Sequence, residues 1–226
     1  MHERTRDGDP AAQEEIAVSA HLLGGLEALG SPPQPHQLRQ LTQLVLLLEE
    51  WSGRINLTGH RDPITMATRL VLDAAALCCL ALPELPEANT LVDLGSGAGF
   101  PGLPISILHP HLRIRLIDSR LKRNHFQRAA RRALDLQNVE PILGRSDELE
   151  VHPAEIVVAQ AMAQPVRALE LMLPWASPGG LLVLPATEDA VQPQIPAGAR
   201  FVEVRRYQLP GIDIRRKLWI ARASTV

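Results

Sequence analysis

Hydrophobic residues recur at helical spacing through the first third of the chain. This pattern predicts two helices, over residues 16–29 and 37–51, separated by the proline-rich segment 31–35. Asp62 followed by Pro63 is typical of a helix start and predicts a third helix over about 64–82. Residues 1–14 are polar, and we expect them to form a disordered tail ahead of a helical segment over 15–88.

After residue 90 the pattern changes to short apolar runs that alternate with helical segments. The runs predict strands over 90–94, 113–118, 139–143, 155–159 and 180–184, with helices over 102–108, 120–134 and 166–173. Such alternation predicts a parallel sheet covered by helices on both faces. Two last runs, 201–208 and 214–221, flank a turn at residues 209–211 and predict an antiparallel hairpin. The sequence therefore predicts an α/β Rossmann-like domain over 89–226, with a mostly parallel seven-stranded sheet.

The composition is that of an ordinary globular protein, with 46% hydrophobic and 21% charged residues. No uninterrupted apolar run approaches the roughly 18 residues of a membrane span, so we expect no membrane partner. The charged N-terminus lacks the apolar core of a signal peptide, which favours the cytoplasm. Cys78 and Cys79 do not have the spacing of a zinc site; we assign no metal and expect both to be buried. Oligomeric state is left open, with a monomer favoured.

The net charge of −2 hides two basic clusters, one over residues 113–132 and one over 205–222. Arginine and lysine clusters can neutralise nucleic-acid phosphates. A solvated helix face or strand edge explains either cluster equally well. The charge pattern therefore permits RNA binding without requiring it.

The segment from Val92 to Gly99, Val-Asp-Leu-Gly-Ser-Gly-Ala-Gly, places glycines where a strand turns sharply into a helix. Backbone N–H groups in such a loop can approach a ligand closely. The spacing also satisfies the dinucleotide-binding pattern of glycines, which leaves an NAD-dependent oxidoreductase as a remote alternative. Asp93, two residues before the first glycine, is placed to organise the loop and to meet the ammonium group of S-adenosylmethionine (SAM). We therefore interpret this segment as a SAM loop.

Acidic residues follow the next two predicted strands. Asp118 ends the strand over 113–118, about twenty residues beyond the glycines, where a carboxylate accepts hydrogen bonds from ribose hydroxyls. Asp147 and Glu148 follow the strand over 139–143 and are candidates for the adenine. Helix capping by Asp118 or Ser119, and by Ser146 or Asp147, is the alternative in each case.

Several segments together resemble the RsmG (GidB) family, which methylates guanine N7 of small-subunit (16S) ribosomal RNA with SAM. They are Trp51-Ser-Gly-Arg-Ile-Asn-Leu-Thr58, Arg61-Asp-Pro63, Arg69-Leu-Val-Leu-Asp73, the block over 92–104, and Leu116-Ile-Asp-Ser119 with Lys122-Arg123. The resemblance covers about residues 40–185. It implies a class I SAM-dependent methyltransferase fold and a 16S ribosomal RNA or 30S subunit partner.

The resemblance also implies two groups of site residues. The cofactor group is Asp93, Gly95, Ser96, Gly97, Gly99, Phe100, Asp118, Ser119, Ser146, Asp147 and Glu148. The substrate group is Asn56, Thr58, Arg61, Arg69, Lys122, Arg123 and Arg145. Guanine N7 carries an in-plane lone pair and attacks a methyl group without losing a proton. We therefore assign no catalytic acid or base, and expect catalysis by proximity and orientation.

The chain departs from the family pattern at three positions: Leu70, Gln160 and Pro185 stand where members usually have a histidine, an arginine and a lysine. Cofactor binding is thus better preserved than substrate recognition. Two alternatives stay open: a relative that binds SAM or S-adenosylhomocysteine as a regulatory module, and a methyltransferase acting on a small molecule or protein.

Overall fold

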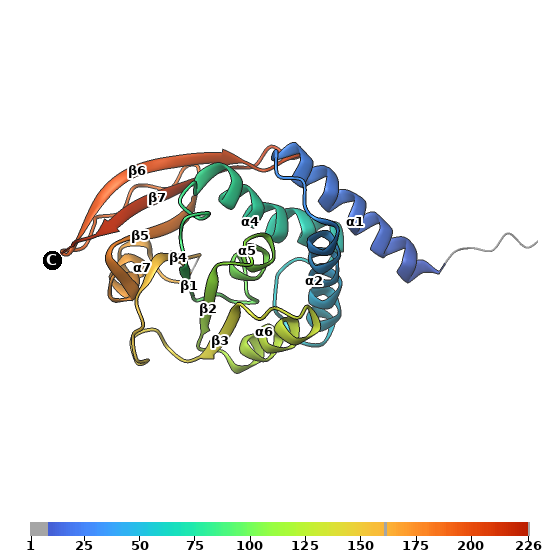
Figure 1. Cartoon of the computed structure of the whole chain (residues 1–226), viewed down its shortest axis with the longest axis horizontal. Helices are drawn as coiled ribbons and strands as arrows, with labels where there is room; N and C mark the ends of the chain where they lie inside the picture. Colours follow the sequence, from blue (N-terminus) through green and yellow to red (C-terminus); the bar gives the residue numbers. More distant parts are fainter. Residues whose placement is uncertain (1–8, 161, 226) are drawn as a thin grey trace, which may run out of the picture.

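The computed structural model describes residues 9–160 and 162–225 and contains a seven-stranded sheet with helices on both faces (Figure 1). The strands are β1 (Thr90–Leu94), β2 (Arg113–Asp118), β3 (Val139–Leu143), β4 (Ala154–Ala159), β5 (Ala176–Thr187), β6 (Ala199–Gln208) and β7 (Arg215–Ala223). Their order is β3-β2-β1-β4-β5-β7-β6. β1 to β5 pair in parallel, whereas β7 runs antiparallel to both β5 and β6. This confirms the predicted Rossmann-like sheet with its C-terminal hairpin.

Two predicted helices precede the sheet, α1 (Pro10–Ala28) and α2 (Pro35–Arg54), and three alternate with its strands: α5 (Gly102–Leu108), α6 (Leu121–Ala133) and α7 (Pro165–Met172). The expectation of a disordered tail over 1–14 is wrong for residues 10–14, which form the first turn of α1; residues 1–8 lie outside the described part. The Asp9 carboxylate accepts a hydrogen bond from the Ala11 N–H at 3.1 Å, and Pro10 occupies the first helical position. Both features favour a helix start at this point.

The third predicted helix is continuous over Pro63–Ala81 and alternates between α and π turns: α3 (Pro63–Met66), η1 (Ala67–Leu72), α4 (Asp73–Ala76) and η2 (Leu77–Ala81). By length and hydropathy alone it could cross a membrane, but 67% of the apolar window is buried inside the protein, as in the core helix of a globular protein. Cys78 is buried and Cys79 is exposed. The expectation of two buried cysteines is thus wrong, because neighbouring helical residues point about 100° apart.

Two hydrophobic clusters lie on opposite faces of the sheet. The larger one joins the N-terminal helices, through Leu22, Leu44 and Leu72, to strand residues such as Leu91. The smaller one packs α7 against the other face and contains Trp175. Between β1 and β4 the direction of strand progression reverses, and a ligand crevice is expected there, outside the carboxyl ends of the strands.

Candidate functional site

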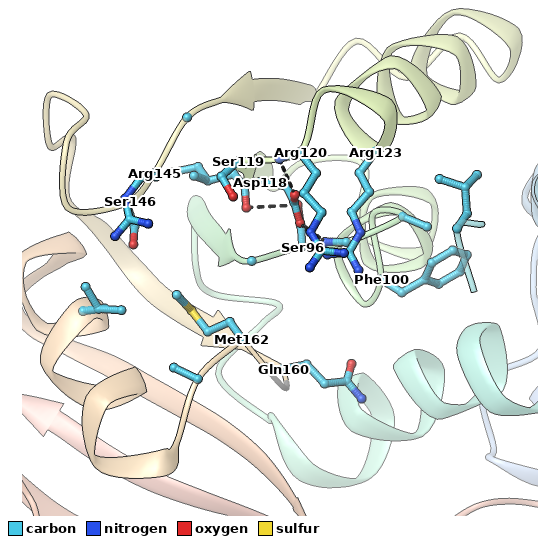
Figure 2. A pocket seen from close by; sticks show the side chains of 18 of the residues that line it. Ser96, Phe100, Asp118, Ser119, Arg120, Arg123, Arg145, Ser146, Gln160 and Met162 are labelled. Atoms are coloured by element: carbon cyan, nitrogen blue, oxygen red, sulfur yellow. Dashed lines mark hydrogen bonds and ion pairs between the residues drawn. The ribbon is translucent and has the colours of Figure 1, made fainter. Parts of the chain in front are cut away.

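A cavity of about 720 Å³ lies at the carboxyl ends of β1 to β4, at the expected reversal point. Figure 2 shows Ser96, Asp118 and Ser119 on one side of it and Gln160 and Met162 on the other. Its lining residues are Leu57, Thr58, Leu70, Gly95, Ser96, Gly97, Ala98, Phe100, Ile117, Asp118, Ser119, Arg120, Arg123, Gly144, Arg145, Ser146, Asp147, Gln160, Met162, Ala163, Arg167 and Leu171. The cavity is large enough for a nucleoside cofactor.

The glycine loop bends because Gly95, Gly97 and Gly99 all adopt positive φ angles, of 65°, 59° and 89°. Gly95 and Gly97 line the cavity, whereas Gly99 does not. A Cβ at Gly99 would lie 2.5 Å from Leu103 Cδ1, so this glycine serves the packing of loop against helix. Two of the three glycines are thus placed to meet a ligand through backbone atoms.

Asp93 lies beneath the cavity rather than on its wall, and is fully buried. Its Oδ2 accepts a hydrogen bond at 3.0 Å from the N–H of Gly102, the first residue of α5. No described group bonds to its Oδ1. Burial, with a smaller contribution from the nearby Asp118 carboxylate, raises the pKa of Asp93 to about 8 despite the opposing effect of the Gly102 hydrogen bond. An unpartnered buried oxygen next to the glycine loop suits a cationic donor such as the SAM ammonium group.

The Asp118 side chain accepts hydrogen bonds from three groups around the glycine loop and the start of α6. It is 4% exposed. Oδ2 accepts hydrogen bonds from the Gly97 N–H at 2.9 Å and from Arg123 at 3.1 Å. Oδ1 accepts one from the Arg120 N–H at 2.8 Å (Figure 2). The carboxylate therefore connects the glycine loop to the start of α6, and Arg123 belongs to the cofactor wall as much as to the substrate rim.

Gln127 is a supporting residue that the sequence patterns did not reveal. It is fully buried on α6, and its Nε2 donates to Ser96 Oγ and to the Gly97 carbonyl, both at 2.8 Å. The side chain thus fixes the glycine loop from the helix behind it. A glutamine inside an arginine-rich helix carries no motif, so only the fold shows this contact.

The wall beside Asp118 comes from the segment after β3, whose Gly144 N–H donates to the Asp118 carbonyl at 3.1 Å. Ser146 and Asp147 line the cavity, while Glu148 does not and instead pairs with Arg145 at 3.0 Å. Arg145 also donates to both Asp147 oxygens, at 3.1 and 2.9 Å, and this hydrogen bonding lowers the pKa of the Asp147 carboxyl. The Trp175 Nε1–H donates to the Ser146 carbonyl at 3.1 Å and fixes this segment to the sheet.

The proposed substrate residues divide between the cavity and its surroundings. Thr58, Arg123 and Arg145 line the cavity. Arg61 donates to the Ser52 carbonyl at 2.7 Å and to Asn56 Oδ1 at 3.1 Å, so this pair shapes the loop before α3. Arg69 lines a small cavity next to Leu70, and Lys122 is exposed on α6. Three of the seven proposed substrate residues therefore line the cavity, and the other four do not.

The three departures from the family pattern meet at the end of the cleft nearest β4 and β5. Leu70 lines the main cavity. Pro185 lines a neighbouring one, and Gln160 lines both. The altered positions therefore line the two adjoining cavities and lie outside the glycine loop itself.

Comparison with known proteins supports the same interpretation. Residues 37–192 match the protein family described as "GidB: rRNA small subunit methyltransferase G". The chain is 33% identical over 204 residues to ribosomal RNA small subunit methyltransferase G of Chromohalobacter salexigens, covering 89% of this chain and 96% of that one. It is 35% identical over 212 residues to the protein of the same name from Deinococcus deserti, covering 87% and 84%.

Solved structures support the fold. A SAM-dependent methyltransferase from Aquifex aeolicus superposes with a TM-score of 0.52 at 17% identity, covering 70% of this chain and 93% of that one. A mutant of MtNAS superposes with a TM-score of 0.57 at 13% identity, covering 95% and 87%. The family match, together with a SAM-dependent methyltransferase among the solved structures of this fold, confirms the predicted cofactor.

Proposed function

Since the chain belongs to the rRNA small subunit methyltransferase G family and is a SAM-dependent rRNA methyltransferase, we propose that it methylates N7 of a guanine in 16S ribosomal RNA. The geometric observation behind this choice of atom is the lining of the cavity, whose described residues include no histidine, cysteine or lysine. Both of its carboxylates, Asp118 and Asp147, are engaged by arginines. Guanine N7 needs no base to remove a proton, and this lining offers none.

When bound, SAM would supply an electrophilic methyl group, which the N7 lone pair can accept without loss of a proton. The residues of the chain are proposed to bind the cofactor and to orient it toward the acceptor base. Gly95, Ser96 and Gly97 are proposed to hold the methionine part, above the buried Asp93 carboxyl. The remaining cofactor contacts are proposed as Asp118 and Ser119 to the ribose, and Ser146 and Asp147 to the adenine. Rate enhancement then comes from alignment of nucleophile, methyl carbon and sulfur.

The rim of the cavity is basic, which supports RNA as the acceptor. Arg120, Arg123, Arg145 and Arg167 line it against two aspartates. Thr58 and Arg145 are proposed to contact RNA directly, and Asn56, Arg61, Arg69 and Lys122 to contact it beyond the cavity. The regulatory, small-molecule and protein-substrate alternatives are not favoured by the family match. We also propose that the protein acts as a monomer in the cytoplasm.

Methyl transfer to ribosomal particles tests this proposal. Tritiated SAM would be incubated with 30S subunits from a strain that lacks its own member of the family. We expect about one methyl group per subunit, at a guanine where reduction followed by aniline cleaves the RNA. Subunits from the parental strain, already methylated, should accept none. Asp118→Asn places an amide nitrogen against the Gly97 N–H, and should reduce both SAM affinity and incorporation by at least about tenfold.

Absence of incorporation by a protein that binds SAM in calorimetry would contradict the proposed acceptor. Incorporation without aniline cleavage would contradict N7 as the methylated atom. Asp213→Asn, at an exposed site on the β6–β7 connection, serves as the matched control and should behave like the wild type.

A further inference from the structure

A second cavity of about 280 Å³ lies beside the cofactor cavity and shares Gln160 and Ala163 with it. It sits at the carboxyl ends of β4 and β5, next to the antiparallel strand β7. Its lining residues are Gln160, Ala163, Pro165, Leu184, Pro185, Ala186, Thr187, Ala190, Arg216 and Trp219. Because the cofactor loop occupies the ends of β1 and β2, this neighbouring cavity is where an acceptor can reach the methyl group.

The walls of this second cavity are mostly apolar, and Arg216 is the charged residue among its described lining residues. Leu184, Pro185 and Trp219 offer flat or aliphatic surfaces, which suit a planar base removed from its stack. A base attached to RNA also brings a phosphate, and a guanidinium group is the preferred partner for phosphate oxygens.

Arg216 is held at this cavity by a buried anchor. Its backbone pairs with Thr187 of β5 on one side and Tyr207 of β6 on the other. Its Nε lies 3.5 Å from Asp73 Oδ2, and the other oxygen of Asp73 accepts a hydrogen bond from the Tyr207 hydroxyl at 2.8 Å. Asp73 is 5% exposed, so the charge of Arg216 is oriented from behind by a carboxyl group that the fold keeps from water.

The guanidinium group keeps donors for a ligand. Its Nε faces Asp73, and no described residue accepts a hydrogen bond from either Nη. The side chain is 23% exposed, enough to be reached from the cavity. Because Arg216 also lines the second cavity, its two Nη groups are available there as donors to a phosphate.

We infer that Arg216 binds the phosphate group of the acceptor nucleotide whose base enters the second cavity. This inference rests on the proposed function. We assign Arg216 to the phosphate rather than to the base because methylation at N7 moves positive charge from sulfur onto the guanine ring. A guanidinium bonded to the ring edge would oppose that charge, whereas one bonded to the phosphate positions the nucleotide without doing so.

Variants of two adjacent arginines on β7 test the inference. Arg216→Ala should lower kcat/KM for 30S subunits by at least tenfold, mainly through KM, and leave the SAM dissociation constant within twofold. Arg216→Lys should recover part of the loss, because it keeps the charge. Arg215→Ala is the matched control, since Arg215 is the exposed neighbour on the same strand and should match the wild type. Equal kcat/KM for the Arg216→Ala and Arg215→Ala proteins would overturn the inference.

A binding measurement separates this inference from the proposed function. Protein loaded with S-adenosylhomocysteine would be titrated with GMP and with guanosine in a calorimeter. We expect Arg216→Ala to weaken GMP binding at least fivefold and to leave guanosine unchanged. Equal weakening of both ligands would assign Arg216 to the base, and absence of GMP binding by the wild type would remove the site; either result overturns the inference. If 30S subunits accept no methyl group, the proposed function fails, and this comparison still decides the role of Arg216.

Discussion

At the scale of single residues, two glycines of the cofactor loop differ in the space around them. Gly97 has only Arg123 Nη1 and the Gly95 carbonyl near its open side, both at 4.0 Å, whereas a Cβ at Gly99 would meet Leu103 Cδ1 at 2.5 Å. Both residues have positive φ angles. Substitution at either position is therefore strained, but only Gly99 also lacks room.

This difference predicts unequal losses of stability for two alanine substitutions. Gly97→Ala should leave a folded protein, with a loss of about 1 kcal/mol in stability, and should weaken SAM binding because its Cβ enters the cavity. Gly99→Ala should cost about 2–4 kcal/mol, since a close packing contact adds to the backbone strain. Urea unfolding and SAM calorimetry on both proteins measure these effects. Equal losses of stability would show that the loop geometry is wrong.

The buried carboxyl of Asp93 predicts a pH dependence of stability. Burial raises the pKa of Asp93 from 3.8 to about 8. The folded state therefore holds a proton that the unfolded state releases, and the contribution of Asp93 to stability falls as pH rises between these two values. Asp93→Asn keeps an acceptor for the Gly102 N–H and has no charge to bury.

The measurement is the difference in unfolding free energy between Asp93→Asn and wild type, without cofactor, at pH 5 and at pH 8. We expect the advantage of the variant to grow by ~1 kcal/mol or more over this interval. Asp213→Asn, at an exposed site, should show no comparable growth. A constant difference across the interval would mean that Asp93 is already ionised at pH 5.

The sequence motifs predicted several residues that line the cavity, and missed those whose position depends on packing. Gly95, Ser96, Gly97 and Asp118 line the cavity as expected. Glu148 does not line the cavity and pairs with Arg145 instead, an outcome that depends on loop conformation. Gln127 and Arg216 approach the site from distant parts of the chain, and no local pattern marks such long-range contacts.

At the scale of elements, α6 positions the glycine loop from behind through Gln127. Its side chain bridges Ser96 Oγ and the Gly97 carbonyl, and its own Oε1 is buried without a described partner. We expect Gln127→Leu, which keeps the volume and removes the bridge, to lower SAM affinity by about tenfold. The unfolding free energy should change little, because the variant also removes an unsatisfied buried oxygen.

Calorimetry with SAM and thermal unfolding measure the two effects of Gln127→Leu separately. His125→Leu, at an exposed position of the same helix, is the control for helix stability. Unchanged SAM affinity in Gln127→Leu would show that the loop holds its shape without α6.

Most boundaries of helices and strands were predicted correctly from the spacing of hydrophobic residues and from the glycine, proline and polar residues between the apolar runs. The strands β1, β2 and β3 begin and end as predicted, because glycine, proline or a polar cluster ends each apolar run. Two boundaries depended on distant or capping partners instead. β5 extends to Thr187 because it pairs with Arg216 of β7, and α1 begins at Pro10 because Asp9 caps it.

At the scale of the whole molecule, the predicted division at residues 88–89 separates two segments that share one core. Val18, Leu22 and Leu26 of α1 are fully buried in the same cluster as strand residues Leu91 and Ile220. The C-terminal hairpin also holds the helical segment, since Arg205 of β6 donates to both carboxylate oxygens of Glu84 at 2.7 Å. We therefore propose that residues 15–88 and 89–226 fold as one cooperative unit.

Leu22→Ala tests this cooperativity because Leu22 lies on α1, far along the chain from the sheet. We expect a loss of about 2–5 kcal/mol, as for other leucines removed from a packed core. Far-UV circular dichroism follows all helices, whereas in a Trp51→Phe background tryptophan fluorescence reports only on Trp175 and Trp219, in the cluster on the opposite face of the sheet. Both signals should shift together and remain coincident. A shift confined to circular dichroism, with the fluorescence transition unmoved, would instead show that the N-terminal helices unfold as a separate domain.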